Sequence, residues 1–172
     1  AKWEALEKGE ITRKELFATR FPDFFRAVGV EADGAQANAD YMQFLSQGRF
    51  VFDGAEDICA KLSEMYSMFI VTNGAKIVQQ GRLTNLPLMQ YFDGVFISED
   101  IGFDKPQKEY FDHVFAHIPE KDKSKVLVIG DSLSSDIRGA LNYGIDCCWL
   151  NRGEDRITDA TYTIRQLSEL LI

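Results

Sequence analysis

The sequence is short of cysteine, of positive charge and of long apolar runs, and each shortage excludes a class of protein. Its 172 residues contain three cysteines (Cys59, Cys147 and Cys148), two of them adjacent, which is a poor framework for disulfides and favours a reducing compartment. Nineteen lysines and arginines against 27 acidic residues give a net charge of −8, which repels nucleic-acid backbones and anionic lipid surfaces. No segment resembles a signal peptide or a membrane span. We therefore expect a cytoplasmic protein that binds neither nucleic acid nor membrane.

Residues 1–50 predict helices without strands, because their apolar residues recur at helical spacing. The segment Thr12-Arg13-Lys14-Glu15 fits a capping box, so a helix should begin there. Pro22 should break that helix or open a second one, and Gly29 should end a helix. Residues 33–48 predict a further helix. One predicted face is aromatic and is expected to pack in the core; it consists of Phe17, Phe21, Phe24, Phe25, Tyr41, Phe44 and Leu45.

After residue 52 the pattern changes to short apolar runs that alternate with helical segments, which is typical of a parallel α/β sheet with crossover helices. A continuous run such as 68–71 indicates a strand buried on both faces. The predicted strands are 68–71, 94–97, 126–129, 147–150 and 162–164. The predicted helices are 55–65, 76–83, 107–117, 134–143 and 166–171.

The residues directly after each predicted strand are the first candidates for a site, because open parallel sheets bind ligands at the carboxyl ends of their strands. Thr72, Asn73 and Gly74 follow the strand 68–71. The backbone amides of such a turn, with a hydroxyl beside them, can hold phosphate oxygens. The alternative is an ordinary turn in which Thr72 and Asn73 cap the next helix.

Lys105 is the second candidate, because the proline after it restricts its backbone. Pro106 favours an extended conformation for Lys105 and suits the first turn of the following helix. A rigidly placed ammonium group suits a site that must neutralise a carboxylate and a phosphate together. The alternative is an ordinary surface lysine before a proline.

Two carboxylates, Asp131 and Asp136, flank the turn after the apolar run 126–129 and form the third candidate. Hard cations such as Mg²⁺ prefer carboxylate oxygens, and the end of a buried strand is a suitable place for them. The alternative is that Asp136 or Ser134 caps the next helix and that Asp131 is a turn residue. Capping explains one acid but not the other, so we favour the metal site.

The three junctions, taken in this order, resemble the motifs of the haloacid dehalogenase-like hydrolase superfamily, and most closely its 5′-nucleotidase-like phosphatases with a helical cap. Residues 71–74 resemble its second motif, residues 104–106 its third, and Gly130-Asp131 with Asp136 its fourth. The resemblance implies that Thr72, Asn73 and Gly74 bind the transferring phosphate and that Lys105 steadies the charges of phosphate and nucleophile. It also implies that Asp131 and Asp136 hold Mg²⁺ directly or through water.

The family's first motif, an Asp-x-Asp pair that supplies the nucleophile and the general acid, has no match before Thr72. The resemblance therefore implies that the sequence begins partway through the cap. Residues 1–50 would be a partial helical cap, and residues 51–172 a Rossmann-like core that lacks its central first strand. The neighbours of that strand would then expose unpaired apolar edges.

These observations together predict a Mg²⁺-dependent phosphohydrolase that acts on a small phosphomonoester such as a nucleoside 5′-monophosphate. The resemblance implies an aspartyl-phosphate intermediate whose nucleophile lies outside the sequence. Two alternatives stay open: a phosphomutase acting on a sugar phosphate with the same core, and a non-catalytic binding module.

Overall fold

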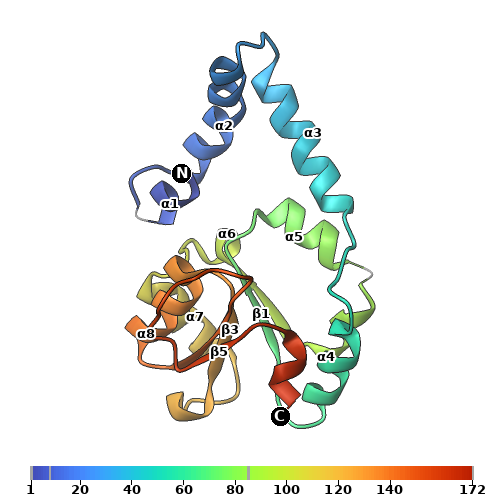
Figure 1. The fold of residues 1–172 in the computed structure, drawn as a ribbon, viewed down its shortest axis with the longest axis vertical. Helices are drawn as coiled ribbons and strands as arrows, with labels where there is room; N and C mark the ends of the chain where they lie inside the picture. Colours follow the sequence, from blue (N-terminus) through green and yellow to red (C-terminus); the bar gives the residue numbers. More distant parts are fainter. Residues whose placement is uncertain (1, 8, 85, 172) are drawn as a thin grey trace. The chain divides into compact units, whose positions relative to one another are not determined.

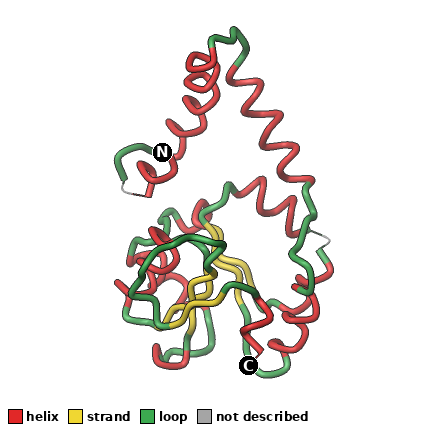
Figure 2. Tube along the Cα trace, in the orientation of Figure 1, coloured by secondary structure: helices red, strands yellow, loops and turns green. Residues whose placement is uncertain are grey.

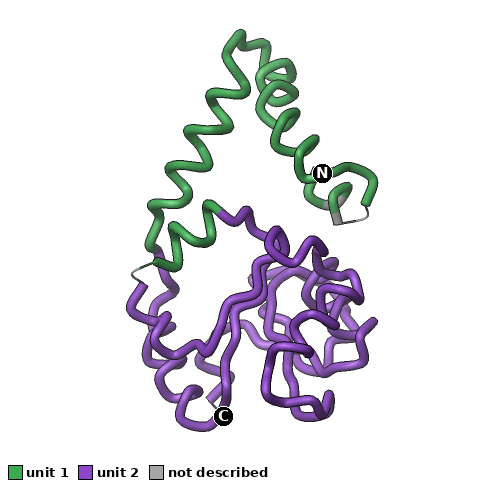
Figure 3. The backbone as a smooth tube through the Cα atoms, turned by 180° about the vertical axis from the view of Figure 1, so that it is seen from behind, with its two compact units in different colours: residues 1–49, 77–84 green, residues 50–76, 85–172 purple. Residues whose placement is uncertain are grey.

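The computed structural model describes residues 2–7, 9–84 and 86–171 of the chain. Its internal contacts divide the chain into two compact units (Figure 3). Unit 1 comprises residues 1–49 and 77–84, and unit 2 comprises residues 50–76 and 85–172. The assignment of residues 1–50 as a cap and 51–172 as a core remains a prediction about the roles of these segments.

Unit 1 is helical: it contains α1 (Lys2–Glu7), α2 (Arg13–Val28), α3 (Gly34–Gln47) and all but the first residue of α5 (Lys76–Leu83) (Figure 1). The capping box at the start of α2 is confirmed, with the Thr12 hydroxyl accepting the Glu15 amide N–H at 3.2 Å. Gly29 ends α2 in the left-handed conformation at φ 69°, as predicted. The side chain of Asp33 caps α3 by accepting two backbone N–H groups.

The prediction that Pro22 breaks the first long helix was wrong, because α2 continues through it. A proline inside a helix removes one backbone hydrogen bond, and packing has to offset that loss. Gly34, at the start of α3, lies so close to Pro22 that a Cβ on the glycine would come within 2.5 Å of the proline ring. This contact between α2 and α3 outweighs the local tendency of proline to break a helix.

The aromatic face of unit 1 is less buried than predicted. Phe24, Tyr41 and Phe44 are exposed by 56%, 43% and 70%, so the prediction of core packing was wrong for them. Leu16 is the buried apolar residue of α2. A charged group occupies part of the space between α2 and α3, because the Arg20 guanidinium lies over the rings of Phe17, Phe21 and Tyr41 and donates to Asn38.

Unit 2 contains two parallel sheets (Figures 1 and 2). In one sheet β1 (Phe69–Thr72) pairs with β2 (Gly94–Ile97). In the other, β4 (Asp146–Leu150) lies between β3 (Leu127–Gly130) and β5 (Tyr162–Ile164). All five predicted strands are confirmed to within two residues at each end. Among the described strands, β4 pairs on both sides and the other four pair on one side, and a missing central strand between β1 and β3 stays a prediction.

The strands at these edges are less buried than the apolar runs indicated. Every residue of β1 is partly exposed, so the expectation of burial on both faces was wrong. In β3 the side chains alternate: Val128 packs in the core, whereas Leu127 and Ile129 are 42% and 39% exposed. An edge strand of this kind has one face covered and apolar side chains on the other.

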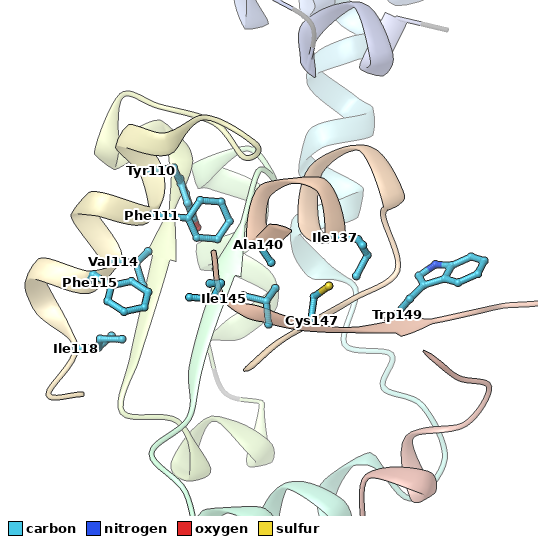
Figure 4. Packing of buried hydrophobic residues seen from close by; sticks show 11 residues of the cluster. Tyr110, Phe111, Val114, Phe115, Ile118, Ile137, Ala140, Ile145, Cys147 and Trp149 are labelled. Carbon is cyan, nitrogen blue, oxygen red and sulfur yellow. The ribbon is translucent and has the colours of Figure 1, made fainter. Parts of the chain in front are cut away.

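The core of unit 2 lies where α7 (Lys108–His117) and α8 (Arg138–Tyr143) pack on β4 (Figure 4). Cys147 and Cys148 are buried in β4, as predicted, and carry free thiols.

The remaining elements are α4 (Ala55–Ser63), α6 (Ser98–Ile101), the 3-10 helices η1 (Pro87–Tyr91), η2 (Lys123–Lys125) and η4 (Leu167–Leu171), and the π-helix η3 (Leu133–Ile137). The predicted helix 134–143 is thus a π-helix followed by α8. None of the described helices is long and apolar enough to cross a lipid bilayer.

Candidate functional site

At the carboxyl end of β1, a buried tyrosine bonds to the backbones of both β1 and β2. Tyr110 of α7 is fully buried, and its hydroxyl accepts the Thr72 N–H at 3.0 Å and donates to the Phe96 carbonyl of β2 at 2.7 Å. Burial raises the pKa of Tyr110 well above its usual value. The chain then turns, with the Thr72 hydroxyl accepting the Gly74 N–H at 3.0 Å. The tyrosine therefore ends the ladder between β1 and β2 at the point where the candidate phosphate-binding turn begins.

Asn73 and Lys105 are joined by two hydrogen bonds that point in opposite directions. The Asn73 amide donates to the Lys105 carbonyl at 2.8 Å, and the Lys105 N–H donates to the Asn73 side-chain oxygen at 2.9 Å. Two such bonds fix both the distance and the orientation of the two segments. Residues 32 positions apart in the sequence therefore form one rigid piece of the site.

Pro106 lies outside the helix that it was predicted to open. The Lys105–Pro106 peptide bond is cis, and α7 begins two residues later with Gln107 as its N-cap. The reason is a turn over residues 104–107, in which the Asp104 N–H donates to the Gln107 side chain and the Gln107 N–H donates to the Asp104 carbonyl. The placement of Pro106 in the first helical turn was therefore wrong.

The ammonium group of Lys105 connects the carboxyl ends of β1 and β3. It donates to the Val71 carbonyl at 2.9 Å and to the Asp136 carboxylate at 2.7 Å. The two charged side chains are 5% and 12% exposed. The second oxygen of Asp136 accepts the Ser132 N–H at 3.1 Å. Both oxygens of Asp136 are thus engaged, and the ion pair is shielded from water.

Asp136 reaches this position because η3 is a wide turn of π-helix. Such turns are rare and are often found at functional sites. Ser132 caps the turn by accepting the Ser135 N–H, so neither of the two caps considered above, Asp136 or Ser134, is the one observed. The carboxylate of Asp136 then folds back onto Gly130, where a Cβ would come within 2.3 Å of an Asp136 oxygen.

Replacing Gly130 with alanine should therefore lower the free energy of unfolding by about 1–3 kcal/mol, the usual cost of overpacking. The new methyl group displaces Asp136 and disturbs its contact with Lys105. Urea unfolding measures this loss. Gly144→Ala is unsuitable as a control because of its positive φ, so Gly94→Ala, whose new Cβ would meet only the Phe69 ring, at 3.3 Å, serves instead. Equal losses for the two variants would contradict the predicted clash.

Asp131 is the accessible acid of the site. Its side chain is 59% exposed and lies 3.9 Å from the Arg152 guanidinium. Its carbonyl accepts the indole N–H of the buried Trp149 at 3.1 Å. The turn is therefore fixed through its backbone while its carboxylate stays within reach of a ligand.

The donor chemistry of these two acids fits Mg²⁺. Magnesium is commonly bound through one or two carboxylates together with water and substrate phosphate. Asp131 offers an accessible carboxylate, and the engaged oxygens of Asp136 retain lone pairs that can accept from a bound water. Within the described part of the chain, no cluster of three histidine, cysteine, aspartate or glutamate side chains is placed to hold a metal ion. This arrangement does not fit a closed zinc site.

The structure thus brings Thr72, Asn73, Gly74, Lys105 and Asp136 into one connected network and places Asp131 beside it. Tyr110, Trp149 and Arg152 also belong to the site and were not predicted from the sequence. Nothing in the pattern around Tyr110 distinguishes it from an ordinary core residue of α7. Arg152 could have been found, because it follows the strand 147–150 just as the other candidates follow theirs.

A family model described as haloacid dehalogenase-like hydrolase matches residues 10–150 of the chain. The chain belongs to this family. The haloacid dehalogenase-like fold accounts for the parallel strands with crossover helices and for the three motifs at their carboxyl ends.

Curated relatives of this haloacid dehalogenase-like chain include a HAD-hydrolase and two pyrimidine 5′-nucleotidases. The chain is 42% identical over 171 residues to the HAD-hydrolase YfnB of Bacillus subtilis, covering 98% of this chain and 73% of that protein. It is 32% identical over 171 residues to the pyrimidine 5′-nucleotidase YjjG of Escherichia coli, covering 98% and 75%. It is also 39% identical over 152 residues to the pyrimidine 5′-nucleotidase PynA of Streptococcus pneumoniae, covering 88% of this chain but 64% of that protein.

Solved structures agree with this membership. The crystal structure of YfnB from Bacillus subtilis bound to magnesium superposes with a TM-score of 0.90 at 43% identity, covering 98% of this chain and 74% of that one. A phosphatase of the same family from Thermococcus onnurineus superposes with a TM-score of 0.68 at 28% identity, covering 87% of this chain and 68% of that one.

Proposed function

We propose that this protein is a Mg²⁺-dependent phosphohydrolase of small phosphomonoesters, and that nucleoside 5′-monophosphates are among its substrates. The observation that carries the proposal is the buried ammonium of Lys105, fixed between the end of β1 and Asp136 and attached through Asn73 to a turn of backbone amides. The pyrimidine 5′-nucleotidases among the relatives support the substrate class. The free thiols support a reducing compartment such as the cytoplasm.

In this proposal the substrate phosphate binds at the turn formed by Thr72, Asn73 and Gly74, where its oxygens accept hydrogen bonds from backbone N–H groups. Lys105 holds a positive charge beside the transferring group. Asp131 and Asp136 hold Mg²⁺, which when bound offsets the negative charge of the phosphate. Tyr110 and Trp149 keep the two turns in place.

The attacking group in this proposal is a carboxylate from outside the 172 residues. It attacks phosphorus, displaces the alcohol and forms an acyl phosphate that water then hydrolyses. The edges of β1 and β3 support this part of the proposal, because a strand paired with both would carry a carboxylate at its end to Lys105.

The test compares phosphate release from nucleoside 5′-monophosphates by the 172-residue chain and by the natural protein that contains it. We expect release by the natural protein in the presence of Mg²⁺, its loss with a chelator, and no release by the 172-residue chain. Release by the shorter chain would assign the nucleophile to these residues and overturn that part of the proposal. A substrate recovered as its isomer without free phosphate would identify a phosphomutase.

In the natural protein, Asp131→Asn should remove most of the phosphate release by weakening the metal site. Asp159→Asn changes the charge by the same amount at another exposed position and should leave the release unchanged. A rise in the Mg²⁺ concentration needed for half-maximal release would identify the metal site as the cause. Near-normal turnover of the Asp131 variant at low Mg²⁺ would contradict the assignment.

A further inference from the structure

The loop after β4 is built to hold one exposed cation in a fixed place. Asn151, the first residue after β4, is 6% exposed. Its side-chain oxygen accepts the N–H groups of Gly153 and Glu154 at 2.9 and 2.8 Å, and its amide donates to the Glu154 carbonyl at 3.0 Å. These three bonds close the loop around Arg152, so the backbone on both sides of that arginine is fixed.

The side chain of Arg152 lies between an aromatic ring and the accessible acid of the site. Its guanidinium carbon is 4.8 Å from the centroid of the Phe52 ring, an arrangement that favours a cation over the ring face. Its Nη1 atom is 3.9 Å from the Asp131 carboxylate. At this distance the arginine partly neutralises Asp131, and it opposes the approach of any second cation to the same carboxylate.

The other cation of the site has much less freedom to meet an anion. Lys105 is 4% exposed, and two of its three N–H donors already bind Val71 and Asp136. Its charge is balanced by the carboxylate of Asp136. Arg152 is 58% exposed and carries five N–H donors in a planar group that suits phosphate.

We propose that Arg152 is the counter-cation of Asp131 in the metal-free protein and that it becomes a phosphate-binding residue once Mg²⁺ occupies Asp131. The inference rests on the proposed function for the metal at Asp131 and for the phosphate group of the substrate. It adds a residue from β4 and its loop to the set at β1 and β3. Mg²⁺ would replace the Arg152 guanidinium beside the Asp131 carboxylate, and the released guanidinium would then bind the phosphate.

This exchange predicts effects of opposite sign from a single substitution. Without the arginine, Mg²⁺ no longer competes with a fixed positive charge, so Arg152→Gln should bind Mg²⁺ about threefold to tenfold more tightly. The same variant loses a charged donor to the anion, so phosphate should bind about tenfold more weakly in the presence of Mg²⁺. A purely structural role for Arg152 would weaken the binding of both.

The experiment titrates the ¹⁵N-labelled natural protein with Mg²⁺, and then with inorganic phosphate at saturating Mg²⁺, and follows amide resonances of the turns after β1 and β3. Arg152→Lys keeps the charge and should retain the wild-type Mg²⁺ affinity with intermediate phosphate binding. Arg156→Gln is the matched control, since Arg156 lies in the same segment, is 67% exposed and pairs with Glu154 at 3.2 Å. It should change neither affinity.

The inference is overturned if Arg152→Gln leaves both affinities unchanged or weakens both. If the wild-type protein binds Mg²⁺ and phosphate and Arg152→Gln changes neither affinity, the inference is wrong and the proposed function stands. If the resonances after β3 of the wild-type protein do not respond to Mg²⁺, there is no metal site at Asp131, and both proposals are wrong.

Discussion

Replacing Lys105 with methionine should lower the free energy of unfolding by about 3–5 kcal/mol, because it leaves the Asp136 carboxylate buried without its counter-ion. Asp136 is 12% exposed and loses its 2.7 Å contact with the ammonium. The Val71 carbonyl also loses a donor. Methionine keeps much of the volume of the lysine stem, so the loss reports charge and hydrogen bonding more than packing. Urea unfolding followed by circular dichroism measures it.

Lys108→Met is the matched control for this substitution. Lys108 pairs with Asp112 at 2.6 Å, but the two side chains are 71% and 46% exposed, and pairs of this kind contribute about 0–1 kcal/mol. The double variant of Lys105→Met with Asp136→Asn should recover part of the loss, because no buried charge is then left unpaired. Equal losses for Lys105→Met and Lys108→Met would contradict a buried role for Lys105.

Replacing Trp149 with alanine should also cost about 3–5 kcal/mol, the range for truncating a large buried aromatic side chain. Trp149 is 1% exposed and belongs to the core cluster of unit 2 (Figure 4). Its indole N–H additionally fixes the Asp131 carbonyl. Trp149→Phe separates the two contributions, since it keeps an aromatic ring in the core and removes only the hydrogen bond and part of the volume. We expect it to cost about 1–2 kcal/mol.

Trp3→Ala is the control for this experiment, because Trp3 is the second tryptophan of the chain and is 43% exposed. It should cost less than about 1 kcal/mol. Unfolding followed by far-ultraviolet circular dichroism avoids the change in fluorescence that each substitution causes. A Trp149→Phe loss as large as that of Trp149→Ala would contradict the expectation that an aromatic ring in the core retains most of the stability.

The elements that could be predicted from the sequence are those that local chemistry decides. The capping box at Thr12, the terminal Gly29 and the five parallel strands follow from short-range patterns and are all confirmed. The burial of Cys147 and Cys148 followed from their place in an apolar strand. The candidate residues at strand ends followed from the general rule for parallel sheets.

The features that could not be predicted depend on contacts between segments far apart in the chain. Pro22 stays inside α2 because Gly34 packs against it, and no local rule reports that contact. The engagement of the Asn73 side chain by Lys105 is of the same kind: the residue type suggested a contact with ligand, whereas its amide faces a backbone 32 residues away. Tyr110 acts through one hydroxyl, and its position among the buried apolar residues of the amphipathic helix α7 gives no sign of that role.

The π-helix η3 makes the position of Asp136 depend on the number of residues in the turn as well as on their identity. In an α-helix each residue advances by about 100°, so removal of one residue from 133–135 would rotate the carboxylate away from Lys105 even with every side chain of the network retained. A deletion within the turn therefore moves the Asp136 carboxylate, whereas a substitution at another position of the turn leaves the number of residues, and with it the direction of that carboxylate, unchanged. The number of residues in this short segment is therefore as much a requirement for the contact between Asp136 and Lys105 as the identity of the two side chains.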